Sequence, residues 1–297
     1  MSTTLQGVTA TLGFVSRDAL NNARGSAPRI VDLRAPMTEA PFSTERVACT
    51  IQDARRTTAN IGLENSGFEL FRRATAVRDW FNADEVVSVY YPECTAFARE
   101  LTGATHAFTF DHLIREPGKQ TAGGGLRTGG TSTVTGPDKG GGYVSGVHLD
   151  YSENSVWSEY LALHGIGEPR DAKRVMVLNF WRSLADVVEG NPLAVCDARS
   201  VRAEDLLETM IFGYGHEGYS WHNIGVAVYN VAFSSQHSWY YYPQMTSDEV
   251  LVFKTYESAA MIGKVSPHGS FENPTAPSSA PPRRSIELRV LCYIGGH

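Results

Sequence analysis

The second half of the chain alternates between short runs rich in β-branched and aromatic residues and breaks that contain Gly, Pro, Asn or Asp. Such runs predict β-strands, because alternating side chains suit a sheet with two different faces. Helical spacing interrupts the series only around residues 155–165 and 203–210. This arrangement favours an antiparallel double-sheet barrel of the jelly-roll type over an alternating βαβ fold. The strands are expected at residues 143–150, 173–184, 224–233, 237–244, 248–256 and 283–294.

The first part of the chain predicts strands and one longer helix. Strand-like pieces cover residues 8–15 and 67–73, and phenylalanines alternate with polar residues over 106–116. Residues 82–103 predict a helix, with a capping asparagine at the start, a proline that begins a second helical piece and a glycine at the end. We expect this helix to pack on the outside of a sheet, so that the fold is mainly β with flanking helices.

Glycine and threonine dominate residues 116–146, which hold almost no apolar side chains. A segment of this composition cannot join a core, so we expect a flexible loop of the length that often serves enzymes as a lid. Its glycines lack the spacing G-x-x-x-x-G-K-[ST] of a nucleotide-binding loop. The chain is expected to be one domain, 1–297, with an N-terminal β/α portion at 1–110 and a jelly-roll core at 143–297.

Composition narrows the choice of partner. The 26 Lys and Arg residues face 32 Asp and Glu residues without a basic cluster, which argues against nucleic acid or a membrane surface. No run approaches the roughly 18 apolar residues of a membrane helix, and no basic and apolar leader is visible, so we expect a cytoplasmic location. The 4 cysteines lie far apart and predict reduced thiols. A small molecule is the expected partner, and the composition is compatible with a homodimer.

The sharpest chemical feature is the sequence His148-Leu149-Asp150 within a predicted strand. On a strand, residues two apart point to the same face, so this imidazole and this carboxylate would converge inside a barrel. Non-haem iron(II) oxygenases use two histidines and one carboxylate, which leave three positions open for a cosubstrate and dioxygen. The pair is common by chance, so the prediction of an iron site depends on a third ligand and on an anchor for the cosubstrate.

For the third ligand, His268 is preferred because it follows the β-rich segment 250–258 and precedes the last predicted strand. His237 and His216 are the alternatives if His268 fails. Histidines in loop-like stretches are more often surface or hydrogen-bonded structural residues. The later histidines are His164, His216, His222, His237, His268 and His297.

The last predicted strand contains candidate residues to anchor the cosubstrate. Arg283 and Ser285 lie two residues apart and share a face, so a guanidinium fork and a hydroxyl could hold the distal carboxylate of 2-oxoglutarate. By the same period Glu287 and Arg289 would point inward, which makes Arg289 a competing anchor. The alternative interpretation is a solvated strand end with local ion pairs. Ile286, Leu288 and Val290 would form the apolar face of this strand.

Alternating aromatic and polar residues on other strands could line a substrate pocket, although such residues often pack in a core with one satisfied polar tip. Tyr240 and Tyr242 would face away from Trp239 and Tyr241, so only one of these two sets can line a cavity. The candidate pairs are Asn179 with Trp181, Trp239 with Tyr241, and Lys254 with Tyr256.

Several blocks of sequence, in order along most of the chain, resemble a known family. They are VYYPECTAFARELTGATHAFTFDHLIR, VHLDYSE, LNFWRSL, NPLAVCDARSV, HSWYYYPQMTSDEVLVFKTYES, PHGSFENP and PPRRSIELRVL. They are similar to the fungal cephem-methoxylase-like and gibberellin-desaturase-like oxygenases, a family that also includes a meroterpenoid endoperoxide-forming enzyme. The resemblance implies a double-stranded β-helix core, with His148, Asp150 and His268 as iron ligands and the cosubstrate arginine within RRSIELR.

The same resemblance implies an enzyme that uses iron(II), 2-oxoglutarate and dioxygen to oxidise a C–H bond of a specialised fungal metabolite. The expected outcome is hydroxylation, desaturation, ring formation or endoperoxide formation on a terpenoid-like substrate. The competing hypothesis is a non-catalytic or differently metallated cupin-like protein that binds a small molecule, which would keep the barrel but need no carboxylate anchor. Release of succinate from 2-oxoglutarate with iron(II) distinguishes the two.

Overall fold

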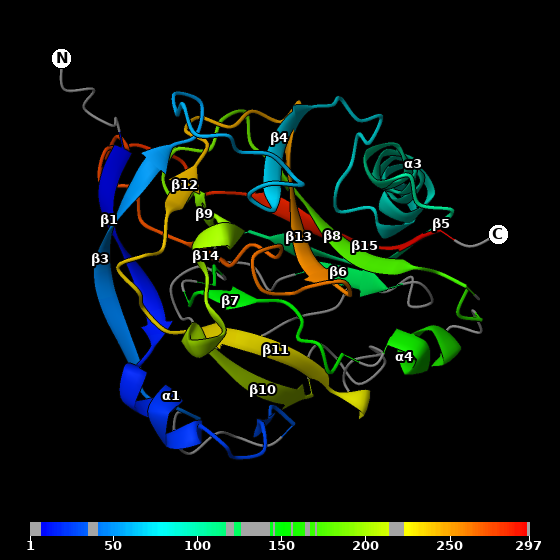
Figure 1. Ribbon diagram of the computed structural model, residues 1–297. Coiled ribbons are helices and arrows are strands. Elements are labelled where there is room, and N and C mark those ends of the chain that lie inside the picture. The colour runs from blue at the N-terminus through cyan, green and yellow to red at the C-terminus, as the bar shows by residue number, and fades with distance from the viewer. Residues whose placement is uncertain are drawn as a thin grey trace.

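Strands dominate the folded chain and assemble into two sheets that face each other (Figure 1). The structure is a computed structural model. It describes residues 7–34, 41–116, 122–125, 143–144, 146–155, 157–163, 167–169, 171–213 and 223–295.

The larger sheet has nine strands within these described ranges, in the order β1-β3-β12-β9-β14-β7-β11-β10-β2. Its neighbours are antiparallel except for the parallel pairs β3–β12 and β10–β2. The N-terminal strands β1 and β3 therefore join a sheet whose other strands come mostly from the second half of the chain. The strands are β1 (Gly7–Val15), β2 (Arg29–Asp32), β3 (Thr44–Asp53), β7 (His148–Leu149), β9 (Leu193–Cys196), β10 (Leu206–Phe212), β11 (Val226–Val231), β12 (Trp239–Tyr241) and β14 (His268–Ser270).

The smaller sheet has six strands in the described part of the chain, in the order β4-β13-β8-β15-β5-β6, and all its neighbours are antiparallel. Side chains from its inner face, such as Trp181 and Phe253, pack against Val195 and Tyr240 of the larger sheet. This apolar contact holds the two sheets together. The strands are β4 (Phe68–Arg72), β5 (His106–Arg115), β6 (Ala122–Gly125), β8 (Arg174–Ser183), β13 (Glu249–Glu257) and β15 (Ser285–Ile294).

Helix α3 covers the outer face of the smaller sheet. Phe97 and Ala98 of α3 pack against Leu178, Val252 and Leu288, which form the outer face of β8, β13 and β15. The described helices are α1 (Arg17–Ala23), α2 (Ala83–Glu85), α3 (Tyr91–Thr102) and α4 (Trp157–Leu163), with a π-helical turn at Val86–Tyr90 and 3₁₀ turns at Ala198–Ser200 and Ala203–Asp205. None of the described helices is long and apolar enough to cross a membrane.

The predicted helix over 82–103 is confirmed. It forms as α2, the π-helical turn and α3 in succession, and the Oδ1 atom of Asn82 accepts hydrogen bonds from the backbone amides of Asp84 and Glu85 at 3.1 and 3.2 Å. Its end is marked by Gly103, which adopts a left-handed conformation with φ of 68°. The fold class, a mainly β double-stranded jelly roll with flanking helices, is confirmed by the two facing sheets.

One predicted helix is wrong. Residues 203–210 form only a short 3₁₀ turn, and the chain then continues as β10, which pairs with β11 and β2. Leu207 and Thr209 alternate with more exposed neighbours on this strand. Leu, Glu and Met favour helices in isolation, but sheet pairing with β11 overrides that weak preference. Of the predicted loop 116–146, residues 122–125 form β6, and most of the remainder lies outside the described residues.

Candidate metal centre

The short strand β7 brings the predicted ligands together. It lies between β14 and β11, and in this register His148 is directly opposite His268 on one side and Asn230 on the other. Cross-strand partners share a face, so the two imidazoles lie side by side with ring centroids 4.5 Å apart. Asp150 follows two residues after His148 and turns to the same point. The nitrogen and oxygen atoms that these three residues offer lie within 4.8 Å of one another.

The chemistry of this donor set fits a divalent transition metal. The Nε2 atoms of His148 and His268 lie 3.4 and 3.5 Å from Oδ1 of Asp150. Metal–nitrogen bonds of about 2.1 Å place neighbouring ligand atoms of an octahedral site roughly 3 Å apart, close to this spacing. The Nδ1 atom of His148 lies 2.8 Å from the carbonyl oxygen of Gly146, which can only accept a hydrogen bond. Nδ1 therefore carries the proton, and Nε2 presents its lone pair to the site.

The surroundings of Asp150 and His268 favour the protonation state in which each binds a metal. Burial opposes ionisation of Asp150, but the Arg289 guanidinium and the nearby His268 hold its pKa well below the usual range. Burial and the neighbouring His148 lower the pKa of His268. A carboxylate beside neutral imidazoles is the protonation state that metal binding requires.

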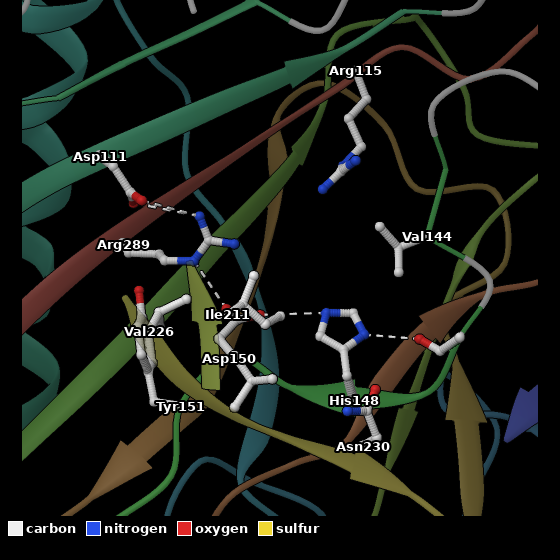
Figure 2. A pocket seen from close by; sticks show the side chains of 12 residues that line it. Asp111, Arg115, Val144, His148, Asp150, Tyr151, Ile211, Val226, Asn230 and Arg289 are labelled. Atoms are coloured by element: carbon white, nitrogen blue, oxygen red, sulfur yellow. Dashed lines mark hydrogen bonds and ion pairs between the residues drawn. The ribbon is translucent and has the colours of Figure 1, made fainter. Parts of the chain in front are cut away.

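A cavity of about 250 Å³ opens beside His148 and Asp150, and Figure 2 shows the side chains around it. One wall is aliphatic and comes largely from β10 and β11. The other is polar and includes Arg115, whose guanidinium pairs with Glu287 at 2.8 Å. The aliphatic residues are Val144, Ile211, Val226 and Val228.

A narrower pocket of about 20 Å³ lies between His268 and Arg283. The guanidinium carbon of Arg283 is 4.2 Å from the ring centroid of Tyr143 and 5.4 Å from that of Trp181. Its Nη1 donates to the carbonyl oxygen of Asn191 at 2.6 Å. Burial lowers the pKa of Arg283 to about 10, so it remains a cation at neutral pH.

Two buried polar atoms in this region have no hydrogen-bond partner among the described residues. They are Nε of Arg283 and Oγ of Ser285. Buried polar groups are nearly always paired, so a donor and a hydroxyl in this state indicate a ligand with acceptor atoms. Carboxylate oxygens accept hydrogen bonds from both kinds of group.

Arg289, the competing anchor, occupies a different place. Its side chain is 6% exposed, its Nε donates to Oδ2 of Asp150 at 2.9 Å, and its Nη1 lies 3.4 Å from both oxygens of Asp111. Nη2 lies 3.2 Å from Glu287. The guanidinium is therefore engaged by protein carboxylates.

Of the candidate pocket residues, Asn179 and Trp181 lie at the site. The Nδ2 atom of Asn179 is 3.3 Å from Oδ2 of Asp150, and Trp181 lines the narrow pocket. Trp239 and Tyr241 face away and pack with Phe14 in the core, which corrects the prediction for this pair. Strand alternation cannot tell which face of β12 is inward. The structure places Tyr240 and Tyr242 on the inner side, with Trp181.

The prediction for Lys254 and Tyr256 is also corrected. The register between β13 and β8 shifts between these two residues, because Thr255 forms a β-bulge. The bulge turns the two side chains to different surroundings. The Nζ atom of Lys254 pairs with Glu64 at 3.0 Å, whereas Tyr256 packs against the ring of Trp157 at 5.3 Å.

The sequence analysis missed several residues around the site. Asp111 and Arg115 lie on β5, and the alternation that places Arg289 on the inner face of β15 also predicts an inward position for them. No sequence pattern indicates Ser270, because its contact with Nη1 of Arg283 at 3.1 Å arises only from the tertiary structure. His237 lies elsewhere, 3.2 Å from Asp205. His164, His216, His222 and His297 lie outside the described residues.

Comparisons with known proteins identify the family. The domain family described as "Oxidoreductase/YMDC permease-like domain" matches residues 18–293. The hydroxylase/desaturase CTB9 of Cercospora beticola is 30% identical over 257 residues, which cover 82% of this chain and 75% of the relative. The hydroxylase/desaturase efuI of Hormonema carpetanum is 29% identical over 264 residues and 86% of both chains. The Fe(II)/2-oxoglutarate-dependent dioxygenase nvfI of Aspergillus novofumigatus is 27% identical over 87% of both chains. This chain belongs to that family of fungal oxygenases.

A solved structure agrees with the assignment of the oxygenase fold. A single-substitution variant of the iron and alpha-ketoglutarate-dependent endoperoxidase NvfI superposes with a TM-score of 0.74 over 98% of both chains, at 23% identity. The oxygenase described here therefore shares the double-stranded β-helix fold of that enzyme. Its His148, Asp150 and His268 form a ligand set suited to iron.

Proposed function

We propose that this enzyme oxidises a C–H bond of an apolar specialised metabolite, with iron(II) held by His148, Asp150 and His268 and with 2-oxoglutarate as cosubstrate. The observation that carries the proposal is the convergence of three ligand atoms beside a cavity with an aliphatic wall. Iron(II) in such a site activates dioxygen for C–H oxidation, while 2-oxoglutarate supplies two of the electrons. Hydroxylation, desaturation, ring closure and endoperoxide formation are outcomes of this chemistry.

The chain's own residues bind and orient the reactants. Arg283 is proposed to donate its guanidinium fork, and Ser285 its hydroxyl, to the distal carboxylate of 2-oxoglutarate. Tyr143 and Trp181 contact the guanidinium on its faces and so fix its direction. Trp181 and Leu193 line the same narrow pocket and would exclude water from it.

The substrate is proposed to lie in the larger cavity, against Ile211, Val226 and Val228. An aliphatic wall gains from burial of apolar surface but offers no hydrogen bonds, so it suits a hydrocarbon skeleton of terpenoid type. A mass-spectrometric screen should find a product whose mass change requires both iron(II) and 2-oxoglutarate. A substrate set confined to charged, polar compounds would contradict this assignment.

The iron and cosubstrate roles are tested by succinate release and by calorimetric titration of Mn(II)-loaded protein with 2-oxoglutarate. His148→Ala, Asp150→Ala and His268→Ala should each abolish succinate release. Arg283→Lys should weaken 2-oxoglutarate binding by about 10–100-fold, because an ammonium cannot form the forked contact. Arg284→Lys is the matched control, since the neighbouring Arg284 side chain is 41% exposed and pairs with Glu116.

Each outcome has a defined meaning. Succinate release that persists in His268→Ala would show that another residue is the third ligand. Unchanged 2-oxoglutarate affinity in Arg283→Lys would remove Arg283 as the anchor. Metal binding without any succinate release from the wild-type protein would favour a non-catalytic cupin-like barrel over an oxygenase.

A further inference from the structure

The two carboxylate oxygens of Asp150 have different surroundings. Oδ1 faces the Nε2 atoms of His148 and His268, at 3.4 and 3.5 Å. Oδ2 faces the other way, where it accepts hydrogen bonds from Nε of Arg289 at 2.9 Å and from Nδ2 of Asn179 at 3.3 Å. Asn179 must present its amide nitrogen here, because its carbonyl oxygen would repel the carboxylate. One oxygen is thus directed to the metal position and the other to protein donors.

The donors to Oδ2 are themselves fixed by the smaller sheet. Arg289 lies directly opposite Asn179 of β8 on one side and Asp111 of β5 on the other, so the three residues form one row across adjacent strands. The side chains of Arg289 and Asp111 are 6% and 2% exposed. From this row Arg289 reaches across to Asp150, which directly follows β7 of the larger sheet, and Figure 2 shows Asp111 and Asp150 joined to its guanidinium.

We propose that Arg289 and Asn179 are positioning residues that hold Oδ2 of Asp150 so that this ligand offers a single oxygen to the metal. Asp111 supports them by fixing Arg289 from its far side, at 3.4 Å. The inference rests on the proposed iron site. A carboxylate that turned both oxygens to the metal would occupy a further coordination position, whereas two histidines and one carboxylate oxygen leave three positions for the cosubstrate and dioxygen.

Charge explains why this role falls to an arginine. Asp150, Asp111 and Glu287 all lie within 3.4 Å of the Arg289 guanidinium. Glu287 also pairs with Arg115 at 2.8 Å, and the guanidinium of Arg289 contacts all three carboxylates. The planar fork can donate to two carboxylates at once, which the single ammonium of lysine cannot do with the same geometry.

The test measures metal binding directly, with Co(II) and Mn(II) as probes. Arg289→Lys and Asn179→Ala should each weaken Mn(II) binding, on the order of 10–100-fold, as is usual when a contact to a ligand's second atom is lost. Both should also change the visible absorption of the Co(II) protein, which reports coordination number. Arg174→Lys is the control, because Arg174 lies on β8 and pairs with the buried Glu257 at 2.9 Å, away from the site.

The readouts separate this role from that of a cosubstrate anchor. A positioning role predicts weaker metal binding with unchanged 2-oxoglutarate affinity in the metal-saturated protein. An anchor role for Arg289 predicts unchanged metal binding and weaker 2-oxoglutarate binding, as expected for Arg283→Lys. That result would overturn the inference. If Arg289→Lys does not fold, the result for Asn179→Ala decides between the two roles. Wild-type Mn(II) affinity and an unchanged Co(II) spectrum in Asn179→Ala would also overturn the inference. A wild-type protein that binds neither metal would instead defeat the proposed iron site itself.

Discussion

At the scale of single residues, burial controls the charge of His112 on β5. Its ring is 3% exposed, and its Nδ1 lies 3.0 Å from the hydroxyl of Tyr91. Burial lowers the pKa of His112 to about 4. The folded protein therefore keeps this histidine neutral in a pH range where the unfolded chain protonates it near its ordinary value of 6.5.

This difference predicts a loss of stability in mild acid. As pH falls from 6.5 towards 4, the unfolded state binds a proton that the folded state does not, so the free energy of unfolding falls by up to about 3 kcal/mol. In urea denaturation of the metal-free protein, His112→Gln should remove this part of the pH dependence. His106→Gln, at an exposed position of the same strand, is the control. An unchanged pH profile in His112→Gln would contradict the assignment.

A separate acid response is expected at lower pH from Glu287. Its burial opposes ionisation, but Arg115 and Arg289 lower its pKa to about 2. Its contribution to stability is present above its ordinary pKa of 4.5 and is lost as pH falls from there towards 2. Above pH 4.5 the Glu287 contribution is fully present, so the His112 effect is measured between pH 6.5 and 4.5.

At the scale of elements, helix α3 shields the outer face of the smaller sheet and ends at Gly103. A left-handed residue here redirects the chain into β5. A Cβ at this position would meet nothing within 4 Å, so a substitution would cost backbone energy alone.

Gly103→Ala should therefore lower the free energy of unfolding by about 1 kcal/mol, with no change in the metal site. Denaturant titration measures the loss. Gly167→Ala is the control, since a Cβ there also meets nothing within 4 Å and the backbone is not left-handed. Equal effects of the two substitutions would show that the loss does not arise from the left-handed conformation.

Strand alternation predicted correctly which face side chains occupy where strands are regular. In β15 it placed Ile286 and Leu288 on the outer face, where they pack under α3, and Arg289 on the inner face beside Asp150. It failed in β13, because the bulge at Thr255 changes the face on which later residues lie. No local property of the sequence marks that bulge.

At the scale of the whole molecule, β1 and β3 form an antiparallel pair that completes the larger sheet through contact with β12. Phe14 of β1 is 1% exposed and packs edge-on against Trp239, with ring centroids 6.0 Å apart. Phe14 thus packs with the side chains of β12 that point away from His148 and His268.

Phe14→Ala should lower the free energy of unfolding by about 3–5 kcal/mol, because it removes a buried ring and leaves a cavity. Denaturation followed by tryptophan fluorescence measures the change. Phe81→Ala, at a side chain that is 41% exposed, should have a much smaller effect. A loss in Phe14→Ala that is as small as the loss in Phe81→Ala would show that the N-terminal strands are not part of the stabilising core.

The complete ligand set was the hardest part to predict from residues alone. His148 lies on the short strand β7 and Asp150 directly follows it, so their spacing suffices to bring them together. His268 comes from a strand far along the chain, and only the order β14-β7-β11 makes it the neighbour of His148. Strand context and family resemblance selected it, whereas alternation within one strand contains no information on which strands become neighbours.

The direct pairing of His148 with His268 limits how such a chain can change during evolution. A slip of one residue in β7 or β14 would turn one imidazole to the opposite face of the sheet. Insertions and deletions in the connecting loops leave this register intact. A single inserted residue within either strand would instead remove a ligand at once, with no gradual intermediate for selection to repair.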